Sequence, residues 1–206
     1  MLTRPGRPGS ACRTLFAIAI VLSLVQQALT QGPRITIDSG SYRGVSIKPP
    51  GSTRTVNKFL SIPYAAPVQR FATPSPPSPS KDEKAADKLP PACPQNGGVG
   101  FGATDISESE DCLYLNVFTP ASNLTSPDAS GRTVMVWFFG GGMQFGTASV
   151  PTYDGTNFSA NHDVIIVAPN YRTNGKYAGL YPTSTVLTVS SLRLPGRSAW
   201  RASFRA

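Results

Sequence analysis

The sequence predicts an α/β fold, and two apolar runs with the segment between them are the basis of this prediction. Residues 133–139 and 164–168 are short, continuous apolar runs, as expected for strands that are covered on both faces of a sheet. The 24 residues that separate them leave room for a loop and a short helix near residues 156–162. A strand, a crossover and a second strand in this order indicate an α/β sheet.

Further strands are predicted ahead of these two runs. Residues 34–38 and 42–48 alternate between apolar and polar on either side of a Ser-Gly pair, which indicates a β-hairpin. Residues 56–64 predict a third strand that ends at a proline, and residues 113–119 alternate and stop before a proline. A hairpin and two more strands would therefore precede the α/β pair.

Two segments are expected to be irregular. The run Pro-Ser-Pro-Pro-Ser-Pro at residues 74–79 lacks the N–H groups that a central strand needs. We interpret it as a surface loop in preference to a ligand for a proline-binding domain. Residues 81–110 show no clear period and include a glycine-rich patch at residues 97–102, so no strand or helix is predicted there.

The net charge does not indicate a basic binding domain. The chain has 19 Lys and Arg against 11 Asp and Glu, for a formal net charge of +8. Residues 1–30 and 175–206 hold three and five of the basic residues and no acid, whereas residues 31–174 hold 11 of each sign. Because the excess lies in two end segments and the middle is neutral, we expect no nucleic-acid partner.

Residues 1–30 have the features of a secretory signal peptide. Three arginines precede an apolar run at residues 15–25, and small residues follow at Ala28 and Thr30, which allows cleavage before Gln31. The alternative is a membrane anchor, but the run is far shorter than the ~20 residues that span a bilayer. We therefore predict a secreted protein without a membrane span, and its charged fraction of 15% suits that class.

Secretion implies further features that the sequence contains. Two N-glycosylation sequons are present, at residues 123–125 and 157–159, so a glycoprotein is expected. Removal of residues 1–30 with Cys12 leaves Cys93 and Cys112, and an even pair in an oxidising compartment predicts one disulfide. Because this bond would close a loop of about 20 residues, it would stabilise the folded state by roughly 3 kcal/mol. One histidine and no Cys-x-x-Cys argue against a zinc site.

The run Phe139-Gly-Gly-Gly-Met143 is the candidate functional segment. Successive glycines reach backbone conformations that other residues avoid and let a ligand approach the amides. Such a turn can aim two N–H groups at one point, as an oxyanion hole requires. A flexible loop is the alternative. The position of the run after a buried strand favours function, because α/β sheets bind ligands at the carboxyl ends of their strands.

The sequence resembles the type-B carboxylesterase family, the lipase and cholinesterase group of the α/β-hydrolases. The most specific match is Glu-Asp-Cys-Leu-Tyr-Leu-Asn-Val-Phe-Thr-Pro at residues 110–120, which fits the family signature over its whole length. The resemblance covers roughly residues 33–174. Supporting blocks occur in the family's order, namely residues 62–65 with Arg70-Phe71, 134–137 leading into 140–142, 153–155 and 170–172.

The resemblance implies a fold and several residue roles. It implies a truncated α/β-hydrolase, with an N-terminal β-hairpin and the first strands of the central mixed sheet in residues 31–174. The amides of Gly141 and Gly142 would be two of three oxyanion donors. Met143 stands where the family usually has an aromatic residue, and Phe139 where many members have His or Tyr. Both changes lie beside the acyl site that the family implies.

The resemblance also implies structural pairs and a reaction. Cys93 would pair with Cys112, and Arg70 would form an ion pair with Glu110. The full-length relative would hydrolyse a small-molecule or lipid ester through an acyl-serine intermediate, with no metal or organic cofactor.

Several polar residues near the last strand have a structural interpretation. Asn170, Tyr171 and Arg172 follow this strand and are expected to shape the scaffold. His162 beside Asp163 could form half of a catalytic dyad, but a polar surface turn before a strand is the simpler interpretation. In the family the catalytic histidine lies far downstream.

The catalytic serine of the family is missing from these 206 residues. Ester hydrolysis in this family needs a Gly-x-Ser-x-Gly elbow with an acid and a histidine, and no serine here has Gly at both −2 and +2. All three triad members would lie beyond residue 174. We expect the chain as written to be inactive as an esterase, and the alternative function is a non-catalytic, cholinesterase-like binding or adhesion protein.

Residues 175–206 depart abruptly from the family pattern. They start with Gly-Lys-Tyr and continue as a Ser, Thr and Arg-rich tail without an acid. Gly-Lys-Tyr can be encoded by a sequence that contains GTAAGT, a common splice donor. Our hypothesis is an aberrant, unstructured tail translated from an unspliced intron, and a divergent tail or a frameshift are the alternatives.

Overall fold

The computed structural model describes part of the chain, almost all of it within one compact unit of residues 33–206. The described residues are 32–67, 74–95, 105–121, 132–173, 188–189 and 204–205. Four predicted features lie outside them: the signal peptide, the sequon at residues 123–125, the glycine-rich patch and the Arg70-Phe71 pair.

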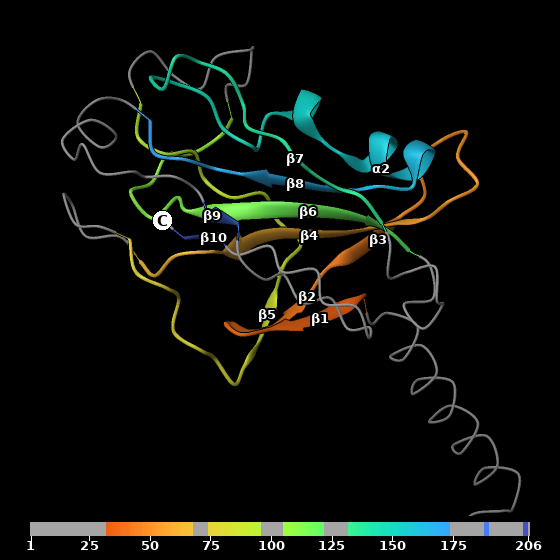
Figure 1. Cartoon of the computed structure of the whole chain (residues 1–206), viewed down its shortest axis with the longest axis horizontal. Helices are drawn as coiled ribbons and strands as arrows, with labels where there is room; N and C mark the ends of the chain where they lie inside the picture. The colour runs from red at the N-terminus through yellow and green to blue at the C-terminus, as the bar shows by residue number, and fades with distance from the viewer. Residues whose placement is uncertain are drawn as a thin grey trace, which may run out of the picture. The chain divides into compact units, whose positions relative to one another are not determined.

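A five-stranded mixed sheet forms the centre of this unit. Its strands lie in the order β3-β4-β6-β8-β7, in which β7 and β8 are parallel and the other neighbours are antiparallel (Figure 1). The sheet confirms the predicted α/β class and the parallel pair. The strand bounds are Val45–Ile47 for β3, Val56–Pro63 for β4, Tyr114–Pro120 for β6, Ile165–Pro169 for β8 and Val134–Val136 for β7.

The crossover between β7 and β8 contains the predicted helix. A 3-10 turn, η2, covers Pro151–Tyr153, and helix α2 covers Thr156–His162. The Oδ1 atom of Asp154 accepts a hydrogen bond of 2.8 Å from the N–H of Thr156, and its Oδ2 atom lies 2.6 Å from the Nζ of Lys58 in β4. Asp154 therefore ties the start of α2 to the central sheet.

Strand β8 agrees with its prediction, but β7 does not. All five residues of β8 are buried. In contrast, Met135 is 43% exposed and Trp137, just after β7, is 49% exposed. The expectation that residues 133–139 are covered on both faces is therefore wrong within the described residues. Val134 and Val136 pack on one face of the sheet, whereas α2 on the other face packs against β4, β6 and β8.

A small second sheet corrects the bounds of the strand predicted at residues 42–48. It contains β1 (Arg34–Ile37), β2 (Gly40–Arg43) and β5 (Glu83–Ala85). The hairpin of β1 and β2 is confirmed, but the strand predicted at residues 42–48 divides at Gly44, after which β3 joins the central sheet. A Cβ atom at Gly44 would collide with the carbonyl oxygen of Lys58, so only glycine allows this approach.

Strand β5 lies in the region that was expected to be irregular. It pairs parallel to β2, and its three residues are all exposed. A three-residue strand without a buried side chain has no alternating pattern, which explains why the sequence did not indicate it.

The two faces of the central sheet are covered by different elements (Figure 1). On one face, side chains of the small sheet pack against β4, β6 and β8. On the other face, α2 packs through Ala160 against β4, β6 and β8. These two core clusters hold β4, β6 and β8 together, and Val134 and Val136 of β7 pack against the first of them. Their buried members are Ile35, Tyr42, Phe59, Ile62, Ala86, Leu115, Val117, Ile165 and Val167 on the first face, and Val56, Leu60, Phe118, Ala160 and Ile166 on the second.

The C-terminal tail contributes two short strands to the described residues. Thr188–Val189 (β9) and Phe204–Arg205 (β10) form an antiparallel pair. The sequence predicted no structure in residues 175–206, and the rest of this tail lies outside the described residues. In the part of the chain that is described, no helix has the length and apolar character to cross a bilayer.

Candidate functional site

The glycine turn, which we define as residues 139–146, follows β7 after two intervening residues, Trp137 and Phe138. The N–H of Trp137 still bonds the carbonyl oxygen of Val167 in β8 at 2.8 Å, and the chain then leaves the sheet. The turn closes where the N–H of Gln144 donates to the carbonyl oxygen of Gly141 at 3.0 Å. The sequence therefore predicted correctly that the glycines form a turn at the carboxyl end of a strand.

Backbone conformation explains why two of these positions are glycine. Gly141 has a φ of 140° and Gly142 a φ of 60°, both in the region that favours glycine. A Cβ atom at Gly141 would also collide with the carbonyl oxygen of Phe145, whereas Gly140 has an ordinary φ and open space around it. Position 141 is thus the most constrained of the three glycines.

The amides of Gly141 and Gly142 are available for a ligand. Among the described residues, no group accepts a hydrogen bond from either N–H. Gly142 and its neighbours Gly140 and Met143 are exposed. Two adjacent donors without an acceptor among the described residues can stabilise a negative charge.

The start of the turn is held by Phe139 and Tyr171. The Phe139 ring is buried and stacks on the Tyr171 ring with centroids 4.1 Å apart. The Tyr171 hydroxyl donates to the carbonyl oxygen of Phe139 at 2.6 Å. Burial, together with nearby Tyr153, raises the pKa of Tyr171, so the hydroxyl keeps its donor proton at neutral pH. Phe139 therefore points into the core, while Met143 is 69% exposed.

The end of the turn is held by Gln95. Its Oε1 atom accepts from the N–H of Gly146 at 2.6 Å, and its Nε2 atom donates to the carbonyl oxygen of Gly146 at 3.2 Å. Gly146 itself has a φ of 116°. A Cβ atom there would lie 2.5 Å from the Phe139 ring and 2.9 Å from the carbonyl oxygen of Gly140. The two ends of the turn are thus in contact with each other.

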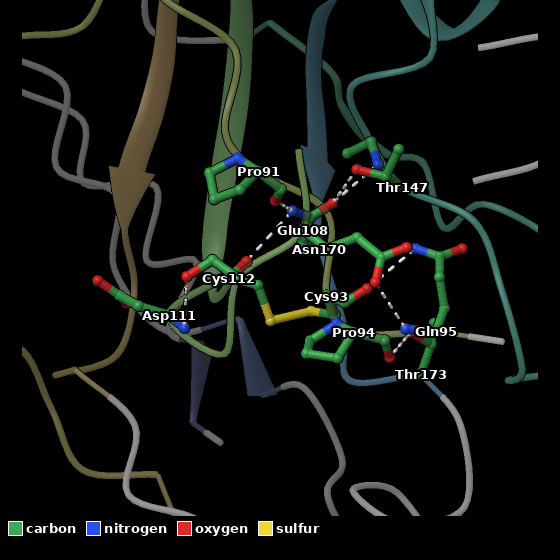
Figure 2. The surroundings of a disulfide bond; sticks show 12 residues. Pro91, Cys93, Pro94, Gln95, Glu108, Asp111, Cys112, Thr147, Asn170 and Thr173 are labelled. Atoms are coloured by element: carbon green, nitrogen blue, oxygen red, sulfur yellow. Dashed lines mark hydrogen bonds between the residues drawn. A yellow bond between two sulfur atoms is a disulfide. The ribbon is translucent and has the colours of Figure 1, made fainter. Parts of the chain in front are cut away.

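Asn170 connects the segment after the turn to the rest of the site. It is fully buried, and Figure 2 shows its side chain among Pro91, Cys112 and Thr147. Its Oδ1 atom accepts from the hydroxyl of Thr147 at 3.0 Å and from the N–H of Ala148 at 2.8 Å. Its Nδ2 atom donates to the carbonyl oxygens of Pro91 at 2.8 Å and Cys112 at 3.2 Å. The side chain therefore uses its full hydrogen-bonding capacity.

A second buried asparagine holds the other backbone group of Ala148. Asn116 lies in β6 and is fully buried. Its Nδ2 atom donates to the carbonyl oxygen of Ala148 at 3.3 Å, and its Oδ1 atom accepts from the N–H of Ser61 at 3.2 Å. Ser61 has a φ of 58° at the irregularity in β4. Asn116 thus joins β4, β6 and the segment after the turn.

The disulfide between Cys93 and Cys112 is confirmed (Figure 2). The two Cα atoms are 5.0 Å apart, and both residues are buried. The cysteines pack with Ala65 and Leu113. The bond closes the loop that carries Gln95 against the start of β6.

Among the remaining predicted residues, His162 and Asp163 make contacts outside the turn. Arg70 is outside the described residues, so its pairing with Glu110 stays a prediction. The His162 ring packs against the Phe158 ring at an angle of 40°, with centroids 4.5 Å apart. The Asp163 carboxylate accepts from the Nε of Arg132 at 3.1 Å. Asp163 is thus engaged by an arginine, which suits a polar turn.

Tyr64 and Arg172 lie on the other side of Asn170. The Tyr64 hydroxyl donates to the carbonyl oxygen of Asn170 at 2.6 Å. Burial raises the pKa of Tyr64, against the opposing effect of the Arg172 charge, so this hydroxyl is a permanent donor at neutral pH. Within the described ranges, no three His, Cys, Asp or Glu side chains come together as a metal site.

Comparison with known proteins identifies the family. A model of the carboxylesterase family matches residues 31–175. The medium-chain fatty acyl-CoA hydrolase precursor of Anas platyrhynchos is 37% identical over 187 residues, which cover 82% of this chain and 32% of that protein. Acetylcholinesterase-1 of Trittame loki is 36% identical over 147 residues (68% and 26%). Cholinesterase of Mus musculus is 41% identical over 149 residues (67% and 24%).

The chain thus spans about a third or less of the length of these curated relatives. The family match includes β7, the glycine turn, the disulfide and Asn170. These similarities show that the chain belongs to the carboxylesterase family.

Proposed function

We propose that this region serves a carboxylic ester hydrolase, in which the amides of Gly141 and Gly142 stabilise the oxyanion. Attack of a serine oxygen on an ester carbonyl places a negative charge on the carbonyl oxygen, and fixed N–H donors lower the energy of that state. The observation that supports this role is the glycine turn, with two unpaired amides among the described residues. The substrate class is a small-molecule or lipid ester.

The nucleophile must come from residues that this sequence does not contain. No Gly-x-Ser-x-Gly elbow occurs in the 206 residues, and loss of a triad costs about a million-fold in rate. We therefore expect the purified 206-residue chain to show no turnover of p-nitrophenyl esters above a blank. Turnover that disappears when Gly141 is replaced would contradict this expectation.

A chimera tests the role of the glycine turn directly. Residues 33–173 would replace the matching segment of mouse cholinesterase, whose remaining sequence supplies the other parts. Gly141→Ala forces the turn away from the carbonyl oxygen of Phe145 and is expected to lower kcat about 10²–10³-fold, as loss of one oxyanion donor does. Gly140→Ala is the matched control, because this position has an ordinary φ and open space. Equal kcat values for the two variants would refute the assignment.

A non-catalytic, cholinesterase-like binding or adhesion protein is the second candidate function. Sequencing of cDNA across the codon for Asn174 separates the two. A transcript that continues into a Gly-x-Ser-x-Gly elbow with a later acid and histidine indicates the enzyme, and it supports our proposal that residues 175–206 derive from an intron. Transcripts that all encode this tail would end the intron proposal.

A further inference from the structure

The Gln95 side chain bridges the disulfide loop and the glycine turn. Its carboxamide pairs with both backbone groups of Gly146, at 2.6 and 3.2 Å. This is the two-point pairing that a residue in a neighbouring antiparallel strand would provide. The same Nε2 atom donates to the carbonyl oxygen of Cys93 at 2.9 Å. One side chain therefore links the backbone of Cys93 to the last residue of the turn.

Gln95 is itself held in place by its own loop. Its N–H donates to a carboxylate oxygen of Glu108 at 3.3 Å. The preceding residue, Pro94, accepts a hydrogen bond of 3.2 Å from the buried hydroxyl of Thr173, as Figure 2 shows. The disulfide fixes Cys93 two residues away. The carboxamide thus starts from a rigid base, and it can impose a position on Gly146.

The other half of the disulfide reaches the same segment through Asn170. The carbonyl oxygen of Cys112 accepts from Asn170, whose Oδ1 atom accepts from Thr147 and Ala148. Gln95 and Asn170 therefore connect the two half-cystines to three consecutive residues, 146 to 148. Within residues 139–148, the Asn170 side chain bonds only Thr147 and Ala148, which follow the turn. Among the described residues, Gln95 provides every hydrogen bond of Gly146.

We propose that Gln95 is a positioning residue that sets the conformation in which the amides of Gly141 and Gly142 are presented. Gly146 packs against Phe139 and Gly140 with no room for a Cβ atom, so a shift of Gly146 moves the start of the turn as well. Release of the Gln95 pair also leaves the N–H of buried Gly146 without an acceptor, and the chain must move to regain one. This inference rests on the proposed function only for the catalytic role of the Gly141 and Gly142 amides. The structural link between Gln95 and these amides does not depend on that function.

NMR of the ¹⁵N-labelled 206-residue chain tests the coupling without any substrate. Gln95→Met keeps the side-chain length and removes the bond to Cys93 and the two bonds to Gly146. We expect amide exchange of Gly146 to accelerate about tenfold or more. The amide resonances of Gly141 and Gly142 should shift at the same time. Gln95→Glu retains an acceptor for the N–H of Gly146 and should preserve its protection in part, with smaller shifts at Gly141 and Gly142.

Gln144→Met is the matched control. Gln144 lies in the turn and is exposed, and its side chain makes no hydrogen bond to the described residues. This change should leave the exchange of Gly146 and the resonance of Gly141 as in the parent chain. A purely stabilising role for Gln95 would lower the melting temperature but leave the Gly141 and Gly142 resonances in place, and that outcome would overturn the proposal.

The same change in the cholinesterase chimera separates this proposal from the proposed function. Gln95→Met should lower kcat and leave KM nearly unchanged, because oxyanion donors act on the transition state. A chimera that never hydrolyses ester, together with shifted Gly141 and Gly142 resonances, would reject the proposed function alone. Unshifted resonances in an active chimera would reject the positioning role alone.

Discussion

Three amide side chains hold the end of the glycine turn and the residues after it. Gln95 bonds Gly146, while Asn116 and Asn170 bond the carbonyl oxygen and the N–H of Ala148. Asn116 and Asn170 are fully buried, where an unpaired polar group would be costly. The hydrogen bonds of each asparagine therefore hold its own side chain in place and also hold the backbone groups that it contacts.

Asn170→Ala should destabilise the chain strongly. The change removes the partner of the Ala148 N–H, of the Thr147 hydroxyl proton and of the Pro91 carbonyl oxygen. The carbonyl oxygen of Cys112 keeps its hydrogen bond from the N–H of Tyr114. Each buried group that loses its partner costs about 1–3 kcal/mol, so we expect a loss of about 3 kcal/mol or more in the free energy of unfolding. Urea unfolding followed by tryptophan fluorescence measures it.

Asn161→Ala provides the comparison for this experiment. Asn161 is exposed on α2, and alanine is a better helix former there. Its free energy of unfolding should equal or slightly exceed that of the parent chain. Equal stability of the Asn170→Ala and Asn161→Ala variants would show that the hydrogen bonds of Asn170 contribute nothing net.

The sequence indicated part of this site and missed part. The glycine run and Asn170 stand out because they follow predicted strands. Gln95 and Asn116 did not, because their partners lie 51 and 32 residues away along the chain and no local pattern reports such contacts. Asn116 occupies a polar position of the alternating strand predicted at residues 113–119, and such a position is expected to face solvent. In the structure it is fully buried. The oxyanion role of Gly141 and Gly142 stays a prediction.

Among the helices and strands, those with a clear period were predicted well. Helix α2 has the predicted bounds, and β4, β6 and β8 lie within about one residue of theirs. The failures have geometric causes. Gly44 separates β2 from β3 because the backbone of Lys58 passes too close for a side chain, and β5 has no buried face. Both failures depend on which strands pair with each other, and the sequence does not show this pairing.

Asp154 links α2 to β4, and its protonation should weaken that link. Burial alone would raise the pKa of Asp154, but hydrogen bonds from Lys58 and Thr156 and the charge of Lys58 hold it below 3.8. A lowered pKa in the folded state stabilises the fold above the unfolded pKa, and this contribution disappears as the pH falls through the folded pKa. Asp154→Asn should therefore lower the melting temperature at pH 7. The expected loss in the free energy of unfolding is up to about 1 kcal/mol, as for a partly exposed ion pair.

The pH dependence distinguishes a loss of the Asp154 charge from a loss of stability that is unrelated to this charge. The difference in melting temperature between the parent chain and Asp154→Asn should shrink as the pH falls from 5 to 3. Asp82→Asn serves as the control, because Asp82 is exposed and its carboxylate makes no ion pair with the described residues. A difference that stays constant between pH 7 and pH 3 would contradict a role for the Asp154 charge.

Over the whole molecule, charge and family similarity divide the chain at nearly the same places. Residues 31–174 have equal numbers of acidic and basic residues, and the carboxylesterase family matches residues 31–175. The excess of +8 lies outside this range. The basic character of the chain therefore says nothing about what the family region binds.

We propose secretion for the protein, and expression in a secretory cell line tests it. The mature N-terminus should be Gln31, and Asn157, which is exposed at the start of α2, should carry a glycan. The hydroxyl of Ser159 is buried and donates to the carbonyl oxygen of Val164 at 2.8 Å, so the sequon must be modified before α2 packs.

Two substitutions separate the glycan from the fold. Asn157→Gln should remove one glycosidase-sensitive mobility step and leave the melting temperature nearly unchanged. Ser159→Ala should remove the same step and also cost about 1 kcal/mol, the typical net value of a hydrogen bond. An Asn157→Gln protein with the mobility of the parent would show that this sequon is not used.

The way in which Ala148 is held has a consequence for how such a turn can change over evolution. Both of its backbone groups are bound by side chains from neighbouring strands, Asn116 in β6 and Asn170 just after β8, and its own methyl group takes no part in these bonds. The position of the turn thus depends on side-chain amides that lie outside it, those of Gln95, Asn116 and Asn170. An exposed turn side chain such as that of Gln144 can therefore change without loss of these hydrogen bonds, whereas Met143, with a φ of 61°, is restricted by its backbone conformation.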